Sequence, residues 1–595
     1  MGLTRYLLVG LCTALAINAL AFAASTAIPL PAADAWHFLD TFVRKALQGD
    51  LQLVDFFAQR GPGDHSQPLH RLVLLAHLGM FDLDFRIEAL VGIVLAVVTC
   101  SLLSITLVRA NGQRNAVTFL GAAAIFAVGL SLNATNIYTW SLVSLIWISL
   151  LLGVLYWMVA ALPLRNGQYI ASMTLATFAM ALALDELAFP TFAAAVAALL
   201  FRDGLRRPQR SLLLLLGGGV GLGAARWSIH QMASGAADAA GAGRFSQLID
   251  VLLGPESWRL LVGPLSDSLI HQEHLVVWFP SSSRGVQIAI ALVLGALHLA
   301  FWWRVFVSRE RVRDTVFVIA VSMMLFFYAS IAGIALSRVT EFGIEYVHQP
   351  RYTAVYQLNV IALILMFAGA TLRPNAEGAR PGPMKGAVLV FLAAVLALQW
   401  PLAHRAWTNA KYIRNYSQEA AVALAKLGAD PGIQPAPKCP SILTVCNQPP
   451  VVRARILGLL KDNRLSIYSA RFREANGFEK LSLEAPPAQA ATIGSPAPAG
   501  CSVTVLRHGP ARVAPGRPFN PQPNGRSAFW LMVPPEAPAF NLEFEGKRVP
   551  LVRRAGVATY LVDDRQLAAI NARRPLRFDV LCEGRKATSF DVAVD

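Results

Sequence analysis

Long apolar runs separated by short basic loops occupy residues 1–403, whereas residues 404–595 mix polar and apolar positions as soluble proteins do. About 20 apolar residues cross a bilayer as an α-helix. The first part therefore predicts a transmembrane domain of about eleven spans, at 6–28, 87–108, 117–133, 139–162, 169–185, 187–201, 211–229, 286–304, 315–336, 353–372 and 386–403. Only Asp185 and Glu186 separate the fifth and sixth runs, so these two could instead form a hairpin that crosses incompletely.

The remaining residues predict a smaller folded region in two sections. Residues 404–483 indicate an α/β segment, with helices near 415–428 and at 451–462 and a strand-like stretch at 465–468. A Pro/Ala-rich linker at 484–499 precedes a small β-rich domain at 500–595. Gly/Pro turns in that domain separate short apolar runs, as in a β-sandwich, at 501–506, 527–533, 540–544, 557–562 and 576–581. This domain could bind a sugar or a partner, or serve as a structural cap.

Composition supports an α-helical polytopic membrane protein with a C-terminal α+β or β-sandwich domain. Hydrophobic residues make up 55% of the chain and charged residues only 15%, where soluble proteins average about 25% charged. The formal net charge is +16, and most Lys and Arg residues stand at the ends of apolar runs. No basic stripe interleaved with aromatic residues is present, which argues against nucleic-acid binding.

The basic loops also predict orientation. They all fall on one side if the N-terminus is cytoplasmic, as the positive-inside rule requires. The loops 29–86, 230–285 and 337–352 and the tail from 404 then lie outside a bacterial inner membrane. The first run also resembles a signal peptide ending at Ala21-Phe22-Ala23, but we expect a retained anchor.

The cysteines indicate an oxidising compartment for the tail. Cys12 and Cys100 lie inside spans, whereas the other four, all in the tail, are Cys439, Cys446, Cys501 and Cys582. An even number of cysteines in an exported domain suggests disulfides. Local spacing favours Cys439–Cys446 and Cys501–Cys582, although three pairings exist. A zinc site is the alternative, but no CxxC motif or neighbouring pair of histidines accompanies these cysteines.

Candidate chemistry begins in the loop 29–86. Asp34 follows the first span, where a carboxylate could act on a lipid headgroup or cap the next helix. From Trp36 to Gln59 the apolar residues recur at roughly helical spacing, which predicts surface helices on the outer leaflet.

A Gly/Pro-rich loop in the same region carries a second cluster of polar residues. Asp64 and His65 could hold a metal or a sugar hydroxyl, and His70 and Arg71 follow at the start of a helix. Arg71 could pair with a phosphate. A solvated turn with a helix cap is the alternative.

Two further groups stand near span ends. Asp185 and Glu186 could orient a substrate or form an exposed hairpin tip. Arg351 stands at the mouth of the tenth span, where its guanidinium suits a lipid phosphate. Its companions are Arg338, His348 and Tyr352. Interfacial anchoring by Arg and Tyr is the alternative.

These features together resemble the GT-C glycosyltransferase superfamily. The resemblance rests on an acid after the first span, a long outer loop with surface helices and an outer arginine. The segment Asp64-His65…His70-Arg71-Leu72 is similar to an Asn-Glu-His-Arg…Arg-Leu segment of bacterial GT-C-like proteins. Three further segments are similar to motifs of the same group. Asn133…Trp140 stands where the group has a Trp-rich segment, Arg351-Tyr352 matches an Arg-Tyr before a late span, and Leu465–Tyr468 resembles a short stretch of the tail. The chain departs from the group in having Asp64 for Glu and a single acid, Asp34, for the usual doublet.

The resemblance implies transfer of a sugar from a polyprenyl-phosphate donor to an envelope glycan, lipid or protein acceptor. Asp34 would take the acceptor's proton, and Arg351, with His348 or Arg71, would stabilise the departing phosphate. One displacement would invert the anomeric centre. Mg²⁺ or Mn²⁺ could sit near Asp34, but nothing in the sequence requires a metal. The alternatives are a transporter or flippase for lipid-linked glycans, and a non-catalytic scaffold for envelope assembly.

Overall fold

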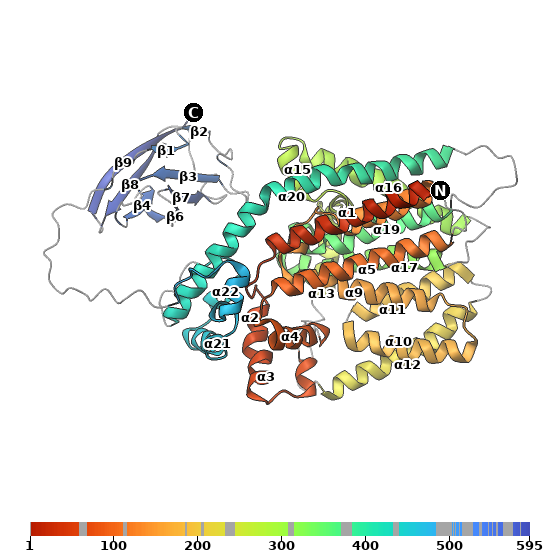
Figure 1. Ribbon diagram of the computed structural model, residues 1–595. Helices are drawn as coiled ribbons and strands as arrows, with labels where there is room; N and C mark the ends of the chain where they lie inside the picture. Colours follow the sequence, from red (N-terminus) through yellow and green to blue (C-terminus); the bar gives the residue numbers. More distant parts are fainter. Residues whose placement is uncertain are drawn as a thin grey trace. The chain divides into compact units, whose positions relative to one another are not determined.

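The structure is a computed structural model that divides into two compact units, Met1–Ala485 and Pro486–Asp595 (Figure 1). It describes residues 2–58, 68–110, 116–184, 187–203, 208–232, 244–307, 315–370, 383–431, 439–483 and, with further short gaps, 503–594.

Among these residues, nine helical stretches are long and apolar enough to cross a membrane. They comprise α1 (Gly2–Thr26), α5 (Arg86–Ala110), α8 with α9 (Ser141–Ser144, Ile146–Ala160), α10 (Asn166–Leu184), α12 (Gln209–Met232), α16 (Ser283–Val307), α17 with η4 and α18 (Thr315–Ile334, Ala335–Val339, Thr340–Phe342), η6 with α19 (Pro350–Tyr352, Thr353–Ala370) and α20 (Pro383–Ala429). This composition indicates a multi-pass membrane protein.

Two of the eleven predicted spans are too short to be among these nine stretches. They are α6 (Ala116–Gly129), with 14 residues, and α11 (Ala188–Asp203), with 16. At about 1.5 Å per residue, α6 extends only about 21 Å. The chain leaves the helix there and turns through residues 130–135 to α7 (Asn136–Thr139). In these turns Asn133 is completely buried and bonds to other elements, which a continued helix would not permit.

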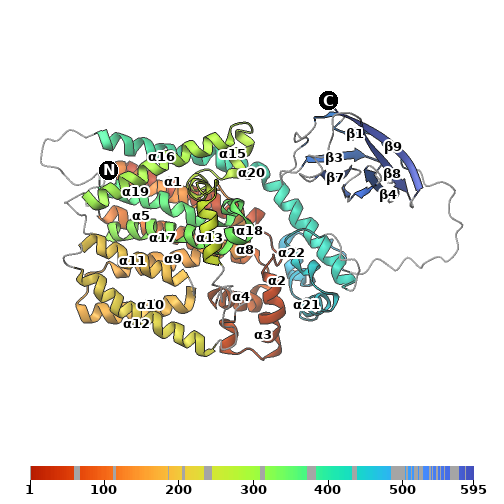
Figure 2. The same ribbon diagram turned by 180° about the vertical axis from the view of Figure 1, so that it is seen from behind.

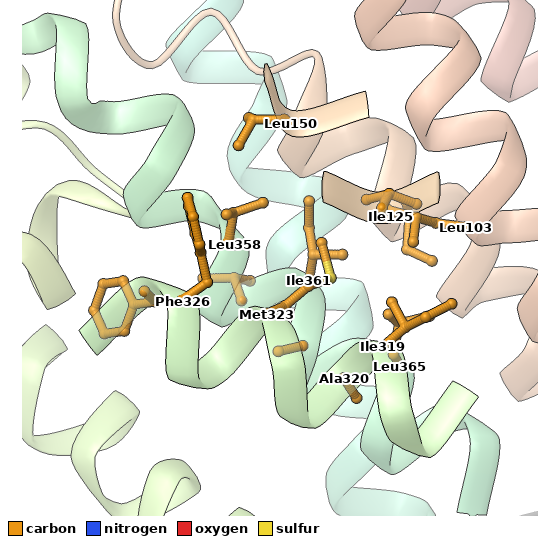
Figure 3. Packing of buried hydrophobic residues seen from close by; sticks show 14 of the residues in the cluster. Leu103, Ile125, Leu150, Ile319, Ala320, Met323, Phe326, Leu358, Ile361 and Leu365 are labelled. Carbon is orange, nitrogen blue, oxygen red and sulfur yellow. The ribbon is translucent and has the colours of Figure 1, made fainter. Parts of the chain in front are cut away.

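The long helices pack around α19, in which 89% of the spanning window is buried. Figure 3 shows Leu358 and Ile361 of α19 beside Met323 of α17, with Leu103 and Ile125 of α5 and α6 close by. By contrast, only 22% of the α1 window is buried. The helix with almost no free face is therefore the centre of the bundle, and α1 lies at its edge.

One polar group crosses the interior of the bundle. Nδ1 of His298, on α16, lies 2.7 Å from the Tyr328 hydroxyl of α17, and its Nε2 lies 3.3 Å from Oδ1 of Asn359 on α19. Trp302 donates to the same Tyr328 oxygen, and the Asn359 amide donates to the Tyr356 carbonyl. Each of these groups therefore has a partner, and the chain of bonds joins three spans.

A second core lies beyond the bundle and joins distant parts of the sequence. Its N-terminal elements are α2 (Ala35–Phe38), η1 (Leu39–Val43), α3 (Arg44–Gln48), η2 (Leu53–Phe56) and α4 (Pro68–Phe81). Its C-terminal elements are the end of α20, η7 (Thr444–Asn447), α21 (Pro450–Asp462), η8 (Ser466–Tyr468) and α22 (Ala470–Asn476). Trp36, Phe38 and Phe42, which were expected to face lipid, are buried in this core.

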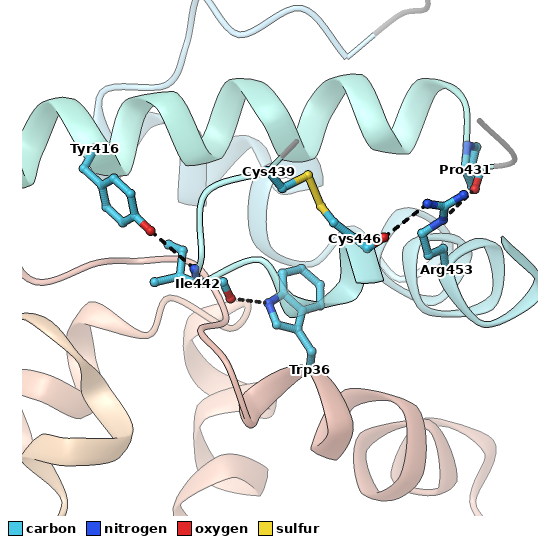
Figure 4. The surroundings of a disulfide bond; sticks show 7 residues. All are labelled: Trp36, Tyr416, Pro431, Cys439, Ile442, Cys446 and Arg453. Atoms are coloured by element: carbon cyan, nitrogen blue, oxygen red, sulfur yellow. Dashed lines mark hydrogen bonds between the residues drawn. A yellow bond between two sulfur atoms is a disulfide. The ribbon is translucent and has the colours of Figure 1, made fainter. Parts of the chain in front are cut away.

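The disulfide Cys439–Cys446 is present and closes a loop against α2 (Figure 4). The Trp36 indole donates to the Ile442 carbonyl at 3.1 Å, and the Ile442 N–H donates to the Tyr416 hydroxyl of α20. The predicted helix at 415–428 is the last part of α20, and the helix at 451–462 is α21.

The strand-like reading of 465–468 is wrong. The stretch is a 3-10 turn in which Ser466, at a φ of +52°, donates its N–H to the Asp82 carbonyl.

The second unit consists of two sheets. One has the order β1 (Arg507–Gly509), β3 (Ser527–Met532), β7 (Val557–Val562), β6 (Val552–Arg554), and the other β2 (Arg512–Val513), β9 (Arg585–Val594), β8 (Leu576–Cys582), β4 (Phe540–Phe544), β5 (Lys547–Val549). Phe529 of the first sheet contacts Phe578 of the second with ring centroids 4.8 Å apart. The expected strands 540–544 and 557–562 match β4 and β7. Cys582 is disulfide-bonded, and Cys501 lies outside the described residues.

Replacing His298 by leucine should lower the stability of the protein. The Tyr328 hydroxyl and the Asn359 amide would lose a partner in an apolar interior, which costs about 1–3 kcal/mol. Thermal unfolding in detergent measures the change, with Leu299→Ala as the control because Leu299 is 75% exposed on the same helix. Equal melting temperatures for wild type and His298→Leu would show that these hydrogen bonds do not stabilise the bundle.

Candidate functional site

Buried polar residues from several elements hydrogen-bond to one another at one end of the first unit. Figures 1 and 2 show α2, α4, α13 (Arg244–Leu253), α15 (Gln272–Trp278) and α18 at the end opposite the N-terminus. We call this the α4 end. Two further elements there are α14 (Arg259–Asp267) and η5 (Ile344–His348), which contact each other. Both π-helical segments, η1 and η4, also belong to this region, and such segments often mark functional sites.

A buried Asp–His pair is the most ordered polar group at this end. Oδ2 of Asp267, the last residue of α14, lies 2.7 Å from Nδ1 of His348, the last residue of η5. Asp267 has no exposed surface, and the His348 side chain is 8% exposed. Among the described residues, no hydrogen-bond partner contacts Nε2 of His348.

Backbone and amide groups hold the carboxylate of this pair in place. Oδ1 of Asp267 accepts a hydrogen bond from the Gln272 N–H at 3.0 Å. The Asn133 side chain donates to the Asp267 carbonyl at 2.7 Å and accepts from the His271 N–H at 2.7 Å. The His271 ring in turn donates from Nε2 to the His348 carbonyl at 2.9 Å. Hydrogen bonds to both Asp267 and His348 therefore hold the pair in place.

Gly263 of α14 makes room for the histidine. A Cβ at this position would lie 2.9 Å from Cε1 of His348 and 3.0 Å from Cγ2 of Val347. Because real side chains do not approach so closely, only glycine allows η5 to pack here without displacing His348.

This geometry defines the tautomer of the neutral His348 ring. The Nδ1–H donates to the carboxylate, so the Nε2 atom of the neutral ring carries the lone pair. A carboxylate that orients imidazole and stabilises its protonated form is the arrangement that general-base catalysis uses. The pair can therefore accept a proton from a hydroxyl placed at Nε2.

Arg351 lies three residues beyond His348, and its guanidinium contacts two neighbouring aromatic rings. Its guanidinium carbon is 5.4 Å from the ring centroid of Tyr346 and 5.2 Å from that of Tyr352. It also donates to the Tyr346 hydroxyl, while its Nε atom is buried without a hydrogen bond. Arg338 is half-buried on η4. The loop thus presents an oriented cation beside the Asp–His pair.

A pocket of about 300 Å³ adjoins the same elements. Its lining residues are Arg259, Gln272, Leu275, Val276, Ser283, Arg284, Gln287 and Glu345. Gln272 connects the pocket to the Asp–His pair, because its backbone N–H bonds to Asp267 while its side chain lines the pocket.

Asp34 occupies a different part of the α4 end. It precedes α2, is half-buried, and makes no side-chain capping hydrogen bond. The neighbouring Ala33 exchanges backbone and side-chain hydrogen bonds with Ile442 and Thr444 of the disulfide loop. Asp34 thus occupies the N-cap position of α2 without a side-chain capping bond, and its catalytic role stays a prediction.

His70 belongs to a buried cluster that the sequence did not suggest. Its Nε2 atom is 3.8 Å from Oε2 of Glu88, and Nδ1 of His77 is 3.2 Å from Oε1 of the same carboxylate. Glu88 is 1% exposed and lies in the first turn of α5. No group of three such side chains among the described residues is arranged to hold a metal ion.

Arg71 forms its hydrogen bonds with backbone carbonyls of the protein itself. Its two terminal nitrogens donate to the carbonyls of Phe56 and Ala58, and its guanidinium stacks over Phe38 and Phe42. Burial lowers the pKa of Arg71 to about 10, against the opposing charge of Asp55. The guanidinium fork predicted for a phosphate is thus occupied by carbonyl oxygens.

Four predicted site residues, Asp64, His65, Asp185 and Glu186, lie outside the described residues. Of the others, the structure stacks Arg351 on Tyr352 and pairs His348, three residues earlier, with Asp267. It places Asp34, His70 and Arg71 with the second core. Sequence reasoning missed Asp267, His271 and Asn133. The pattern Asp267…His271…His274, at helical spacing, was the one local signal for this part of the site.

Searches against protein-family models, curated proteins and solved structures find no match to this chain.

His274 makes the stability of this region depend on pH. Burial lowers the pKa of His274 to about 4, although its hydrogen bond to the Asn133 carbonyl opposes the shift. The unfolded chain binds a proton below about pH 6.5, whereas the folded protein resists it until about pH 4. Stability should therefore fall as the pH drops from 6.5 to 4, by on the order of 3 kcal/mol.

The measurement is the melting temperature in detergent between pH 7.5 and 4.5. His274→Gln keeps a donor for the Asn133 carbonyl and should flatten the pH dependence, whereas His404→Gln, at an exposed position, should leave it unchanged. A variant curve as steep as that of wild type would assign the pH dependence to other groups.

Proposed function

We propose that this chain is a membrane glycosyltransferase that moves a sugar from a polyprenyl-phosphate donor to an envelope glycan, lipid or protein acceptor on the outer face of the inner membrane. The observation that carries the proposal is the buried Asp267–His348 pair, whose Nε2 has no partner among the described residues. The resemblance to GT-C enzymes supports the choice of a lipid-linked donor.

The reaction needs one proton acceptor and one stabilised leaving group. Nε2 of His348 takes the proton of the acceptor hydroxyl as that oxygen attacks the anomeric carbon, and Asp267 stabilises the imidazolium that forms. The bond from the anomeric carbon to the phosphate oxygen breaks, and its electron pair leaves with the lipid phosphate. Arg351, oriented by two tyrosines, offsets the charge that develops there. The anomeric centre is inverted.

Asp34 is the second candidate for the proton acceptor, as the resemblance implies. It is half-buried at the same end of the unit, and its neighbour Ala33 is hydrogen-bonded to the disulfide loop. We favour His348, because its partner carboxylate is completely buried and already bonded to it.

A transporter would require a polar route through the spans. Inside the described spans the His298 group is one polar cluster and the hydroxyl pair Tyr156–Thr177 is another, and both are hydrogen-bonded within the protein. That closure supports a structural role for the group and favours chemistry at one end of the bundle over passage through it.

The test is the cell-envelope glycan profile, by mass spectrometry, of a deletion strain complemented with each variant. His348→Gln and Asp267→Asn should lower the glycan product about 10²- to 10⁴-fold, since both remove general-base catalysis. His404→Gln, at an exposed position on α20, should restore the wild-type profile.

Variants that fold like wild type and restore the profile completely would overturn the proposal in favour of transport or scaffolding. If only Asp34→Asn abolishes the product, the transferase stands and the proton acceptor is Asp34.

A further inference from the structure

The pocket between α14, α15, η5 and the start of α16 lies at the end of a membrane span and carries polar atoms that lack partners. We propose that it binds the phosphate group of an anionic lipid. The inference goes beyond the proposed function, because the phosphate can bind whether or not a sugar is transferred.

The unpaired side-chain amide of Gln287 is the first observation that indicates a bound ligand. It lies on the first turns of α16, is 8% exposed, and lines the pocket. Its amide nitrogen, Nε2, is buried without a hydrogen bond. A buried donor left unpaired destabilises a protein, so such groups call for an explanation. An oxygen atom of a bound ligand would supply the missing acceptor.

The charge of the pocket indicates an anion. Arg284 stands at the N-terminus of α16, and its guanidinium carbon lies 5.0 Å from the Trp258 ring centroid. Among the described residues it has no carboxylate partner. Arg259 also lines the pocket but is paired with Glu345 and Glu256. The lining thus carries two arginines and one glutamate, and Arg284 is the cation that a phosphate would meet beside the positive end of a 25-residue helix.

The surroundings indicate that the phosphate belongs to a lipid. The pocket opens where the candidate span Ser283–Val307 begins, which is the depth of a headgroup. Val276 lines the pocket and is 49% exposed, and further along α16 the exposed apolar residues are Leu292, Val293 and Leu299. An acyl or prenyl chain attached to the phosphate could therefore follow the apolar face of α16.

The pocket also contains a hydrogen-bond acceptor that has no donor. Oε1 of Gln272 is buried without a hydrogen bond, and it could receive a hydroxyl group of the headgroup. Because the Gln272 N–H bonds to Asp267, a ligand in the pocket would lie next to the Asp–His pair.

The experiment measures binding to the purified full-length protein in dodecyl maltoside, with dihexanoyl phosphatidic acid as the probe. Wild type should bind it at least tenfold more tightly than dihexanoyl phosphatidylcholine or inorganic phosphate. Arg284→Gln and Gln287→Met should each weaken binding about tenfold, the value of one hydrogen bond to a charged group.

Gln287→Met provides the sharper test, since it removes an unpaired donor. The melting temperature of the ligand-free variant should equal or exceed that of wild type, whereas a glutamine needed for packing would lower it when replaced. Arg414→Gln, an exposed arginine on α20, is the control and should bind the probe like wild type.

Wild-type affinity in both pocket variants would overturn the proposal. Inorganic phosphate binding as tightly as the lipid would show a site for free phosphate and overturn the lipid assignment. His348→Gln should bind the probe normally, so failure of the transfer reaction is separable from failure of this site.

Discussion

The hydrogen bonds of Asn133 are the constraint on which the α4 end depends. This residue follows α6, has no exposed surface, and joins Asp267, His271 and His274 through its side chain and carbonyl. To place it there, α6 must stop short of a full membrane crossing and the chain must turn inside the protein. A polar backbone at membrane depth is tolerated only where protein groups satisfy it. The early end of one helix thus positions α14 and α15, and through them the carboxylate that holds His348.

Two sets of buried polar groups among the described residues differ in their hydrogen bonding. Inside the bundle, the His298 group satisfies its own hydrogen bonds and joins three spans. At the α4 end, Gln287 and Arg351 each retain a buried nitrogen without a partner. Proteins keep such destabilising groups mainly where a ligand or a reaction makes use of them. A ligand at the α4 end would supply the partner that Gln287 and Arg351 lack, whereas the His298 group needs none.

The second core shows that the loop after the first span packs against protein, where the sequence predicted helices on the membrane surface. Its apolar residues, including Trp36 and Phe42, pack against the end of α20 and the disulfide loop. A periodic apolar face is equally suited to a lipid surface and to another helix, since burial of either kind removes it from water. The presence of residues 439–483 as a partner makes it a protein core. The segment that carries Asp34 is held by this core, and α20 connects it to the bundle.

The sequence by itself determined the membrane class, most of the span positions and several strands of the second unit, because hydrophobic run length, period and turn residues are local properties. It favoured the Cys439–Cys446 disulfide without excluding the other pairings. It also identified His348, Arg351 and Tyr352 as polar residues beside a span. Only the tertiary structure decided that Asp267, 81 residues away, is the partner of His348, that Glu88 lies between two histidines, and that α6 ends early. Pairings of this kind depend on which helices pack together, and packing is set by contacts between residues far apart in the chain, which no local pattern records.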